Sequence, residues 1–305
     1  MGVDVVDDNT IALVALLQTT KRPWAEVRDD LSERTAIELL ESESPLTLFG
    51  NETEELLDRA RDQVRQWLDE GIQVASPSSN QYPVQLRSVH DYPPLLFSRG
   101  HFRSDDSDAI AVVGTRTPSD GALRFIDETV PLLAQEGLPI VSGIARGVDS
   151  AAMRASLKSG NRTVGIIGTG IRKYYPSENR ELQDEVAQHH LLLSQFWPDS
   201  PPTKQSFPMR NHVMSAFSQL TLIVEATEKS GTRIQARAAT RHARPLVITR
   251  SVLQGTTWAK ELLKQRFDVT VVGNANEAIH AVREIMARRS RPAAWERAAL
   301  SLTAS

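Results

Sequence analysis

The segment SGIARGVDSAAMRA, residues 142–155, combines residue types that suit the binding of an anion. It follows an apolar run and continues into a pattern rich in helix formers, so we expect a buried strand, a tight turn and a helix start. Gly143 and Gly147 permit the turn, and the unpaired N–H groups of the helix start face it. Arg146 adds a forked cationic donor that matches phosphate. The segment predicts a phosphate-binding loop, with Asp149 as a cap for free N–H groups.

Glycine, hydroxyl and arginine residues also follow three other apolar runs of strand length. Parallel strands end at one edge of a sheet, and ligands of such sheets bind at that edge. We therefore expect these loops to form one phosphate-binding rim, supported by Asp149, Asn179 and Glu225. The rim residues are Gly114, Thr115 and Arg116, then Ser142, Gly143, Arg146 and Gly147, then Gly168, Thr169 and Gly170, and last Ser230, Gly231 and Thr232.

The segment after the last of these loops is expected to form a helix with a row of arginines on one face. Four arginines are spaced by 4, 4 and 3 residues, the spacing of one helical face: Arg233, Arg237, Arg241 and Arg244. The opposite face is expected to pack: Ile234, Ala238 and Ala239. The row rises by roughly 6 Å per step, close to the repeat of a nucleic-acid backbone. Residues 201–250 carry 8 basic and 2 acidic residues, so the row favours nucleic acid over a merely solvated face.

The segment FPMRNHVMSA places an aromatic ring close to an arginine. Phe207 precedes Arg210 and Asn211 at the start of an expected helix, and an exposed aromatic ring beside an arginine can stack on a nucleobase. Phe207 can equally be an anchor in the core, and both interpretations stay open. The pair Tyr174 and Tyr175 carries the same ambiguity.

The elements that must position these residues predict an α/β fold. From residue 109 onwards, near-continuous apolar runs alternate with helical patterns, which is typical of a parallel sheet covered by helices on both faces. We therefore expect a doubly wound, mostly parallel sheet. The predicted strands lie at 109–113, 139–141, 164–167, 191–193, 220–224, 245–248 and 269–272.

The pattern of the chain divides it into four segments. Residues 1–70 show helical spacing of apolar residues and predict a small helical domain. Residues 71–108 are punctuated by proline and predict an extended connector with one or two short strands. The main domain then covers 109–288, and 289–305 form a short basic tail.

Charge is distributed unevenly between the ends of the chain. Residues 1–70 hold 17 acidic and 7 basic residues, a net of −10, and the remainder holds 21 acidic and 28 basic, a net of +7. A polyanion would be drawn to the second part only. The chain has no cysteine, which excludes disulfides, thiolate metal sites and a cysteine nucleophile. An acidic N-terminus and the lack of an apolar run of about 18 residues predict a cytoplasmic protein without a membrane segment.

Several motifs that carry chemistry are missing. The sequence contains no GxGxxG dinucleotide fingerprint, no GxxxxGK[ST] phosphate loop and no GxSxG nucleophile elbow. The seven histidines show no HxxxH or HExxH spacing, and no carboxylate cluster indicates a metal. We therefore expect no metal and no cofactor, and binding is better supported than catalysis.

Six motifs together resemble the DNA-processing protein A family, also called DprA or Smf. They fall in the order and spacing of that family: GTR at 114–116, SGIARGVDSAAMRA at 142–155, GTG at 168–170, YPSEN at 175–179, FPMRN at 207–211 and VEATEKSGTRIQA at 224–236. The segment 82–100 also resembles the lead-in to the main domain of that family, and the resemblance is strong from 82 to 240.

The resemblance implies an extended Rossmann-like fold preceded by a sterile-alpha-motif-like domain at 1–70. It implies a protein that is not an enzyme, that binds single-stranded DNA, forms a homodimer and helps to load the RecA recombinase during natural transformation. The family's phosphate-contacting loops correspond to 114–116, 142–147 and 168–170, and its FPxRN element corresponds to 207–211.

Two other classes of function stay open. The wider superfamily resembles the LOG phosphoribohydrolases, whose PGGxGTxxE element lies where this chain has EKSGTRIQ, so a nucleotide hydrolase or a nucleotide sensor, including one in phage defence, is an alternative. Gln235 stands where that chemistry needs a glutamate, and an amide cannot act as a general base. A structural adaptor that works through the acidic helices is the third reading.

Overall fold

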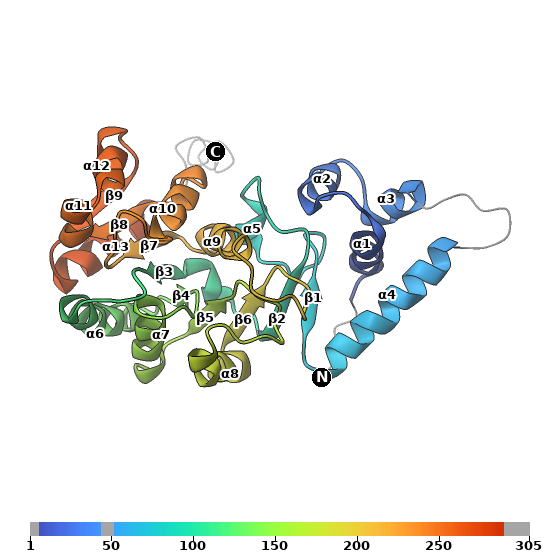
Figure 1. Cartoon of the computed structure of the whole chain (residues 1–305), viewed down its shortest axis with the longest axis horizontal. Helices are drawn as coiled ribbons and strands as arrows, with labels where there is room; N and C mark the ends of the chain where they lie inside the picture. The colour runs from blue at the N-terminus through green and yellow to red at the C-terminus, as the bar shows by residue number, and fades with distance from the viewer. Residues whose placement is uncertain (1–5, 44–51, 290–305) are drawn as a thin grey trace, which may run out of the picture.

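The structure is a computed structural model that describes residues 6–43 and 52–289 (Figure 1). The basic tail predicted at 289–305 lies outside these ranges except for its first residue. Within the described ranges, nine strands form one sheet in the order β1-β2-β6-β5-β4-β3-β7-β8-β9. The strands are β1 (Gln73–Ala75), β2 (Leu96–Gly100), β3 (Ile110–Val113), β4 (Ile140–Ser142), β5 (Thr163–Ile166), β6 (Leu191–Ser194), β7 (Leu220–Ile223), β8 (Leu246–Thr249) and β9 (Val269–Val272).

The strands from β3 to β9 pair in parallel, as the alternation of apolar runs and helical patterns predicts. The order reverses at β3, which lies between β4 and β7, so the topology switches at the loop that follows β3. Ligand sites of doubly wound sheets lie beyond the carboxyl ends of the strands at such a switch. The sheet class predicted from the sequence is therefore confirmed, and it places the glycine loops at one edge.

Helices cover both faces of this sheet (Figure 1). Along β3, Ala111 and Val113 pack with α5, α9, α10 and α12, whereas Ile110 and Val112 pack with α6, α7 and α13, because successive strand residues point to opposite faces. The helices are α5 (Val84–Arg87), α6 (Asp120–Gln135), α7 (Val148–Lys158), α8 (Arg180–His189), α9 (Ser206–Phe217), α10 (Thr232–Arg241), α11 (Arg250–Gly255), α12 (Thr257–Lys264) and α13 (Ala275–Arg289).

The segment predicted as a connector supplies two strands of the sheet. β2 pairs antiparallel with β6, with Phe97 opposite Ser194, and β1 pairs antiparallel with β2 at the edge. A short 3-10 helix, η1 (Ser104–Asp108), leads into β3. The sheet thus begins well before residue 109, and the division of the chain into domains stays a prediction.

The acidic N-terminal segment forms the helices α1 (Asp8–Thr19), α2 (Trp24–Asp30), α3 (Ala36–Glu43) and α4 (Glu52–Asp69), which lie beside β1 (Figure 1). These helices share an apolar cluster with β1, β2 and α8. Aromatic rings form much of the junction: Trp67 lies 5.2 Å from Phe97, and Trp24 lies 5.2 Å from Trp197, both edge to face. The likeness of this segment to a sterile alpha motif stays a prediction.

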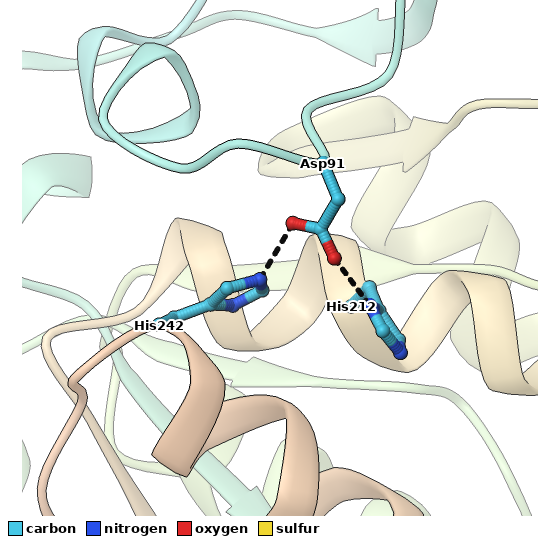
Figure 2. Close-up of side chains that lie close together, drawn as sticks. All are labelled: Asp91, His212 and His242. Carbon is cyan, nitrogen blue, oxygen red and sulfur yellow. Dashed lines mark hydrogen bonds and ion pairs between the residues drawn. The ribbon is translucent and has the colours of Figure 1, made fainter. Parts of the chain in front are cut away.

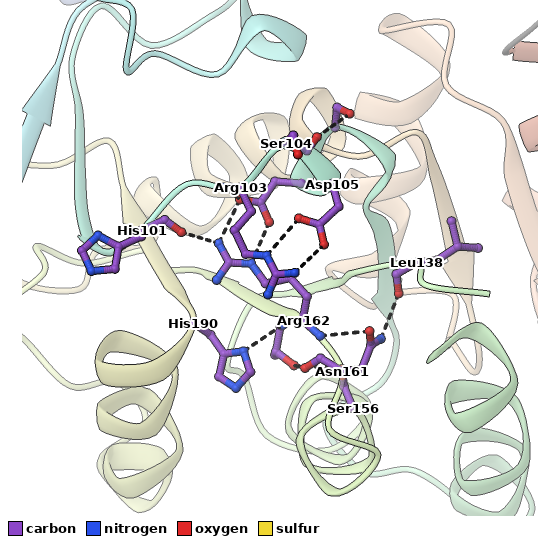
Figure 3. A network of polar contacts seen from close by, with 12 residues as sticks. His101, Arg103, Ser104, Asp105, Leu138, Ser156, Asn161, Arg162 and His190 are labelled. Atoms are coloured by element: carbon purple, nitrogen blue, oxygen red, sulfur yellow. Dashed lines mark hydrogen bonds and ion pairs between the residues drawn. The ribbon is translucent and has the colours of Figure 1, made fainter. Parts of the chain in front are cut away.

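A buried ion pair joins the lead-in to the sheet at the amino ends of the strands (Figure 3). Arg162, directly before β5, donates from Nε and Nη2 to the two carboxylate oxygens of Asp106 at 2.8 and 2.9 Å. Its Nη2 also donates to the carbonyl of His101, and Asp106 accepts from the backbone N–H of Arg103 at 2.8 Å. Both side chains are about 95% buried, so the guanidinium and the carboxylate satisfy each other away from water.

Candidate nucleic-acid interface

A cavity of about 400 Å³ lies at the carboxyl ends of the strands, next to the topology switch. We call it the strand-end cavity. It is bounded by the loop after β3, the start of α7, one side of α9, and the loop that leads into α10. Its lining includes Gly114, Thr115, Arg116, Ala145, Asp149, Phe207, Arg210, Asn211, Lys229, Ser230, Gly231, Thr232, Ile234 and Gln235. Three of the four predicted rim loops therefore reach one cavity.

A second cavity of about 360 Å³ lies beside the first. We call it the tyrosine cavity, because Tyr174 and Tyr175 line it together with Gly143, Arg146 and Gly168. Four residues line both cavities and separate them: Arg116, Ala145, Phe207 and Arg210. The fourth predicted loop, at 168–170, thus reaches the rim through Gly168 alone.

Arg210 lies between the two cavities and is only 6% exposed. It belongs to α9, and its Nη1 donates a hydrogen bond of 2.8 Å to the carbonyl of Ile166 at the end of β5. Within the described residues, its Nε has no hydrogen-bond partner and no carboxylate forms an ion pair with it. Burial lowers the pKa of Arg210, the nearby carboxylate of Asp149 opposes that shift, and the charge of Arg116 adds to it. Two cations directed at one space, one of them buried, form a site for an anion.

The side chain of Arg210 explains why residue 143 is a glycine. A Cβ at this position would lie 1.6 Å from Nη1 of Arg210, so any side chain would displace the guanidinium. The backbone N–H of Gly143 donates to Asp149 at 3.1 Å. Burial raises the pKa of Asp149, while the charge of Arg210 and the loop amides oppose that rise. Asp149 thus braces the loop between β4 and α7, which refines the prediction that it caps a helix.

Arg116 and Lys229 supply further positive charge at the strand-end cavity. Both side chains are exposed, and neither forms an ion pair among the residues that the structure describes. Arg146 differs, because its Nη2 donates to Glu178 at 2.5 Å on the surface. The arginine that marks the loop in the sequence is therefore already partnered, and the available cations come from neighbouring segments.

An aromatic pair lies at the entrance to the tyrosine cavity. The rings of Tyr175 and Phe207 are 5.1 Å apart and tilted by 42°. Phe207 packs on Gly168, where a Cβ would lie 2.8 Å from the ring, and it is only partly buried. Tyr175 is 43% exposed. Phe207 therefore combines both interpretations of the sequence, since it is anchored on a backbone and still presents a ring to the cavity.

The other predicted residues brace the loops and do not line either cavity. Gly147, with a φ of 78°, lets the backbone of Thr115 approach where a Cβ would lie 2.4 Å from its oxygen. Asn179 donates to the carbonyl of Ile144 at 2.9 Å, and Glu225 accepts from the N–H of Ser119 at 2.8 Å. Three more have their polar or backbone groups occupied within the fold: Ser142, Thr169 and Gly170.

The arginine row faces a different space. Arg233, Arg237 and Arg241 line a groove of about 440 Å³ between α10 and α12, together with Trp258 and Phe267. We call it the α10–α12 groove. No described residue lines both spaces, because the strand-end cavity meets α10 at Thr232, Ile234 and Gln235, on another face of the helix. The rim loops and the arginine row therefore do not share one cavity.

Two predictions for this helix are wrong. Arg244 is not part of the row: α10 ends at Arg241, the chain reverses at Ala243 with a φ of 52°, and Arg244 is 92% buried. It donates to the carbonyl of Ala216 at 3.2 Å, and burial lowers its pKa to about 10. Ile234 does not pack in the core but is 37% exposed in the lining of the strand-end cavity, because α10 packs through its alanines.

Several residues that line the two cavities were not among the predicted site residues, and three of them bear on the chemistry of the site. Lys229 lies in the loop before Ser230, where its charge was a visible signal. Tyr175 was noted only as ambiguous, and its pairing with Phe207 needs the fold. Gln235 lines the cavity, is 99% buried, and within the described residues has no partner for Oε1.

Comparisons with known proteins identify relatives of this chain. The family model described as "DNA recombination-mediator protein A" matches residues 73–283. The DNA processing protein DprA of Bacillus subtilis is 36% identical over 195 residues, which are 64% of this chain and 66% of that protein. The chain thus spans just under two thirds of the length of that relative.

Two solved structures share the fold. The structure of DNA processing protein A from Streptococcus pneumoniae covers 89% of this chain and 92% of its own, with a TM-score of 0.65 and 24% identity. The structure of DNA processing protein A from Helicobacter pylori covers 70% of this chain and 96% of its own, with a TM-score of 0.61 and 28% identity. The latter concerns the single-stranded DNA binding mode of that protein. Within the described ranges, no helix has the length and apolar character needed to cross a bilayer.

Proposed function

Because this chain belongs to the DNA recombination-mediator protein A family, we propose that it binds single-stranded DNA at the strand-end cavity. The observation that carries the proposal is the state of Arg210. Its guanidinium is buried at the meeting of two cavities next to Arg116, it forms no direct ion pair among the described residues, and the carboxylate of Asp149 acts on it only as a nearby charge. A buried cation of this kind is costly in the empty protein and is offset when an anion enters.

A phosphate at this position would meet several donors at once. Arg210 and Arg116 would contact it as forked donors, and Lys229 would add a point charge. The start of α10 lies in the same lining and has no acidic residue in its first turn, so the positive end of the helix dipole adds to the charge at the cavity. Glu225 and Asn179 hold the loops in place without entering either cavity.

Unpaired bases fit the tyrosine cavity. The exposed ring of Tyr175 and the partly buried ring of Phe207 offer a stacking surface beside the phosphate donors. A base can reach such a surface only when it is not held in a duplex, so the aromatic pair favours single strands. The α10–α12 groove, with its three arginines, would receive the strand as it leaves the cavity.

We further propose that the bound strand is protected and handed to the RecA recombinase, as the family resemblance implies, and that the protein acts as a homodimer in the cytoplasm. No chemical step on DNA is included. Gln235 occupies the place at which nucleotide hydrolysis would need a glutamate, and Asp149 is engaged by loop amides. The nucleotide sensor and hydrolase are not favoured, and the likeness to DprA proteins supports the role in DNA uptake and recombination.

The test is a competition titration by fluorescence anisotropy. The full chain is bound to a labelled oligothymidine of 20 nucleotides, and unlabelled single strand, the matching duplex and AMP are added separately. We expect the single strand to compete best and AMP to compete only at far higher concentration. Equal competition by the duplex, or release of adenine from AMP, would remove the proposal.

The aromatic pair has its own control. Tyr175→Ala should weaken binding of the oligonucleotide by about fivefold or more, since stacking of one base contributes roughly 1–3 kcal/mol. The matched control is Tyr175→Phe, which keeps the ring and should bind like the unchanged protein. Tyr82→Ala is not a suitable control, because Tyr82 is buried. Equal affinity of Tyr175→Ala and Tyr175→Phe would exclude a stacking role for this ring.

A further inference from the structure

Three side chains that are far apart in the sequence converge outside both cavities (Figure 2). Asp91 comes from the loop between α5 and β2, His212 from α9, and His242 from the residue that follows α10. Asp91 Oδ2 lies 2.6 Å from His212 Nδ1, and Asp91 Oδ1 lies 2.7 Å from His242 Nε2. One ligand atom of each residue lies within 4.8 Å of the others.

The cluster is enclosed on one side and open on the other. The side chain of His242 is fully buried, whereas those of Asp91 and His212 are 18% and 26% exposed. An ion can therefore enter past His212 and end in a partly dry site. None of the three residues lines the strand-end or the tyrosine cavity.

The inner histidine has the partner that a metal ligand needs. His242 Nδ1 lies 3.0 Å from the hydroxyl of Ser215, which is fully buried. If His242 keeps its proton on Nδ1 and donates it to Ser215, then Nε2 presents a lone pair toward Asp91. A hydrogen bond on the far nitrogen fixes the tautomer and orientation of ligating histidines in metal sites. Ser215 supplies this bond from within α9.

The same four groups could be read as a serine nucleophile with its base and acid, but the burial excludes that reading. Ser215 has no exposed surface, and it does not line any of the cavities described above. A substrate carbonyl could not reach its hydroxyl. A nucleophile has to be accessible to its substrate, so Ser215 is not one, and the accessible part of the cluster is the His212 side.

The donor set and its spacing suit a zinc-class ion. Two imidazoles and one carboxylate bind Zn²⁺ at about 2.0–2.1 Å, and two ligand atoms at a tetrahedral angle then lie about 3.3 Å apart. The two hydrogen-bonded pairs here are 2.6 and 2.7 Å apart and all three ligand atoms lie within 4.8 Å of one another, so the two short pairs have to separate by about 0.6 Å to admit an ion. Small side-chain rotations provide that movement, and water would fill the fourth position.

We propose that Asp91, His212 and His242 bind one divalent transition-metal ion of the zinc class. The ion would tie the loop before β2 to α9 and to the end of α10. His212 follows Arg210 by two residues on α9, so the two side chains leave the helix on different sides. The metal would therefore fix the helix that carries Arg210 without touching the bound strand.

The test uses the full chain without a histidine tag, first treated with a chelator and then titrated with Zn²⁺ by calorimetry. We expect one ion per chain and a rise in the melting temperature, because an ion that binds only the folded state stabilises it. Co²⁺ in place of Zn²⁺ should give visible absorption bands of a four-coordinate site. His212→Ala and His212→Gln should each weaken zinc binding by about 100-fold or more, since each removes a direct ligand.

His212→Gln keeps an amide donor that can hydrogen-bond Asp91, so it separates loss of the ion from loss of the hydrogen bond. The matched control is His280→Ala, which removes an exposed histidine of α13 and should leave zinc binding unchanged. Circular dichroism confirms that each variant is folded. The proposal is overturned if His212→Gln binds Zn²⁺ as tightly as the unchanged protein, or if the unchanged protein binds none at a defined stoichiometry.

Discussion

Two buried arginines of this protein have the same exposure, 6%, and opposite surroundings. Arg162, at the amino ends of the strands, meets both oxygens of Asp106 and the carbonyl of His101. Arg210, at the carboxyl ends, has one hydrogen bond, to the carbonyl of Ile166, and an Nε without a partner among the described residues. The charge of the first arginine is neutralised by a direct ion pair, whereas the second has no direct ion pair among the described residues and borders two cavities.

The difference teaches that burial alone does not separate structural from functional charges. A buried ion pair resists the loss of either partner, because the remaining charge would be left without water or counterion. A buried charge beside a cavity already bears part of that cost, so its removal affects ligand binding more than folding. Four substitutions can break or sharpen this contrast.

Arg162→Ala should have the largest effect. It leaves the carboxylate of Asp106 buried and unpaired, and we expect the free energy of unfolding to fall by about 3–5 kcal/mol. Urea denaturation followed by circular dichroism measures this loss. The control is Arg103→Ala, which removes an exposed ion pair with Asp105 and should change stability little. If Arg162→Ala lowers the free energy of unfolding no more than this control does, Arg162 is not the structural arginine that the comparison requires.

Arg210→Met should reverse the pattern. It keeps an unbranched side chain of similar length and removes a buried charge that forms no direct ion pair among the described residues, so stability should fall far less than in Arg162→Ala, because only the attraction of the nearby Asp149 is lost. Affinity for the oligonucleotide should fall about 10- to 100-fold, since a hydrogen bond to a charged group contributes about 1.5–3 kcal/mol. Anisotropy and urea denaturation on the same preparation give both values. Lower stability with full affinity would assign Arg210 to the fold.

Gly143→Ala tests the position of the guanidinium without removing it. The new methyl group would lie 1.6 Å from Arg210 Nη1, so the side chain has to move, and we expect roughly a tenfold loss of affinity. Gly255→Ala is a matched control, since Gly255 lines neither cavity and a Cβ there meets nothing within 4 Å. Similar affinities of the two variants would show that the exact place of Arg210 is unimportant.

Arg146→Ala should have the smallest effect, about twofold to threefold on affinity, because this arginine is exposed and already bonded to Glu178. Glu178→Gln removes the carboxylate that pairs with Arg146, so this variant should bind the oligonucleotide slightly more tightly. Both values come from the anisotropy titration. A loss of affinity for Arg146→Ala as large as for Arg210→Met would show that the loop between β4 and α7 makes the main contact with DNA.

The sequence predicted the parallel sheet and the position of the glycine loops at one edge of it, because both follow from local patterns, while phosphate binding by these loops stays a prediction. An apolar run and the glycine after it lie within a few residues of each other. The predicted rim loops reach the cavities through Arg116, Gly143, Gly168 and Gly231, as expected from strands that end at one edge.

Contacts between distant residues could not be predicted in the same way. Asp106 and Arg162 are 56 positions apart, and His242 lies 151 positions from Asp91. Helical spacing placed Arg244 on the arginine row, but the helix ends three residues earlier and the chain turns toward β8. Nor does the motif FPMRN reveal that Arg210 is buried, since that depends on where α9 lies on the sheet.

The salt dependence of DNA binding tests the central claim most directly. For single strands, the logarithm of the binding constant falls with the logarithm of the salt concentration by about 0.7 per phosphate that is neutralised. We predict a steep slope for the unchanged protein and a slope shallower by about 0.7 for Arg210→Met. Equal slopes for the two proteins would contradict the assignment of Arg210 as a phosphate contact.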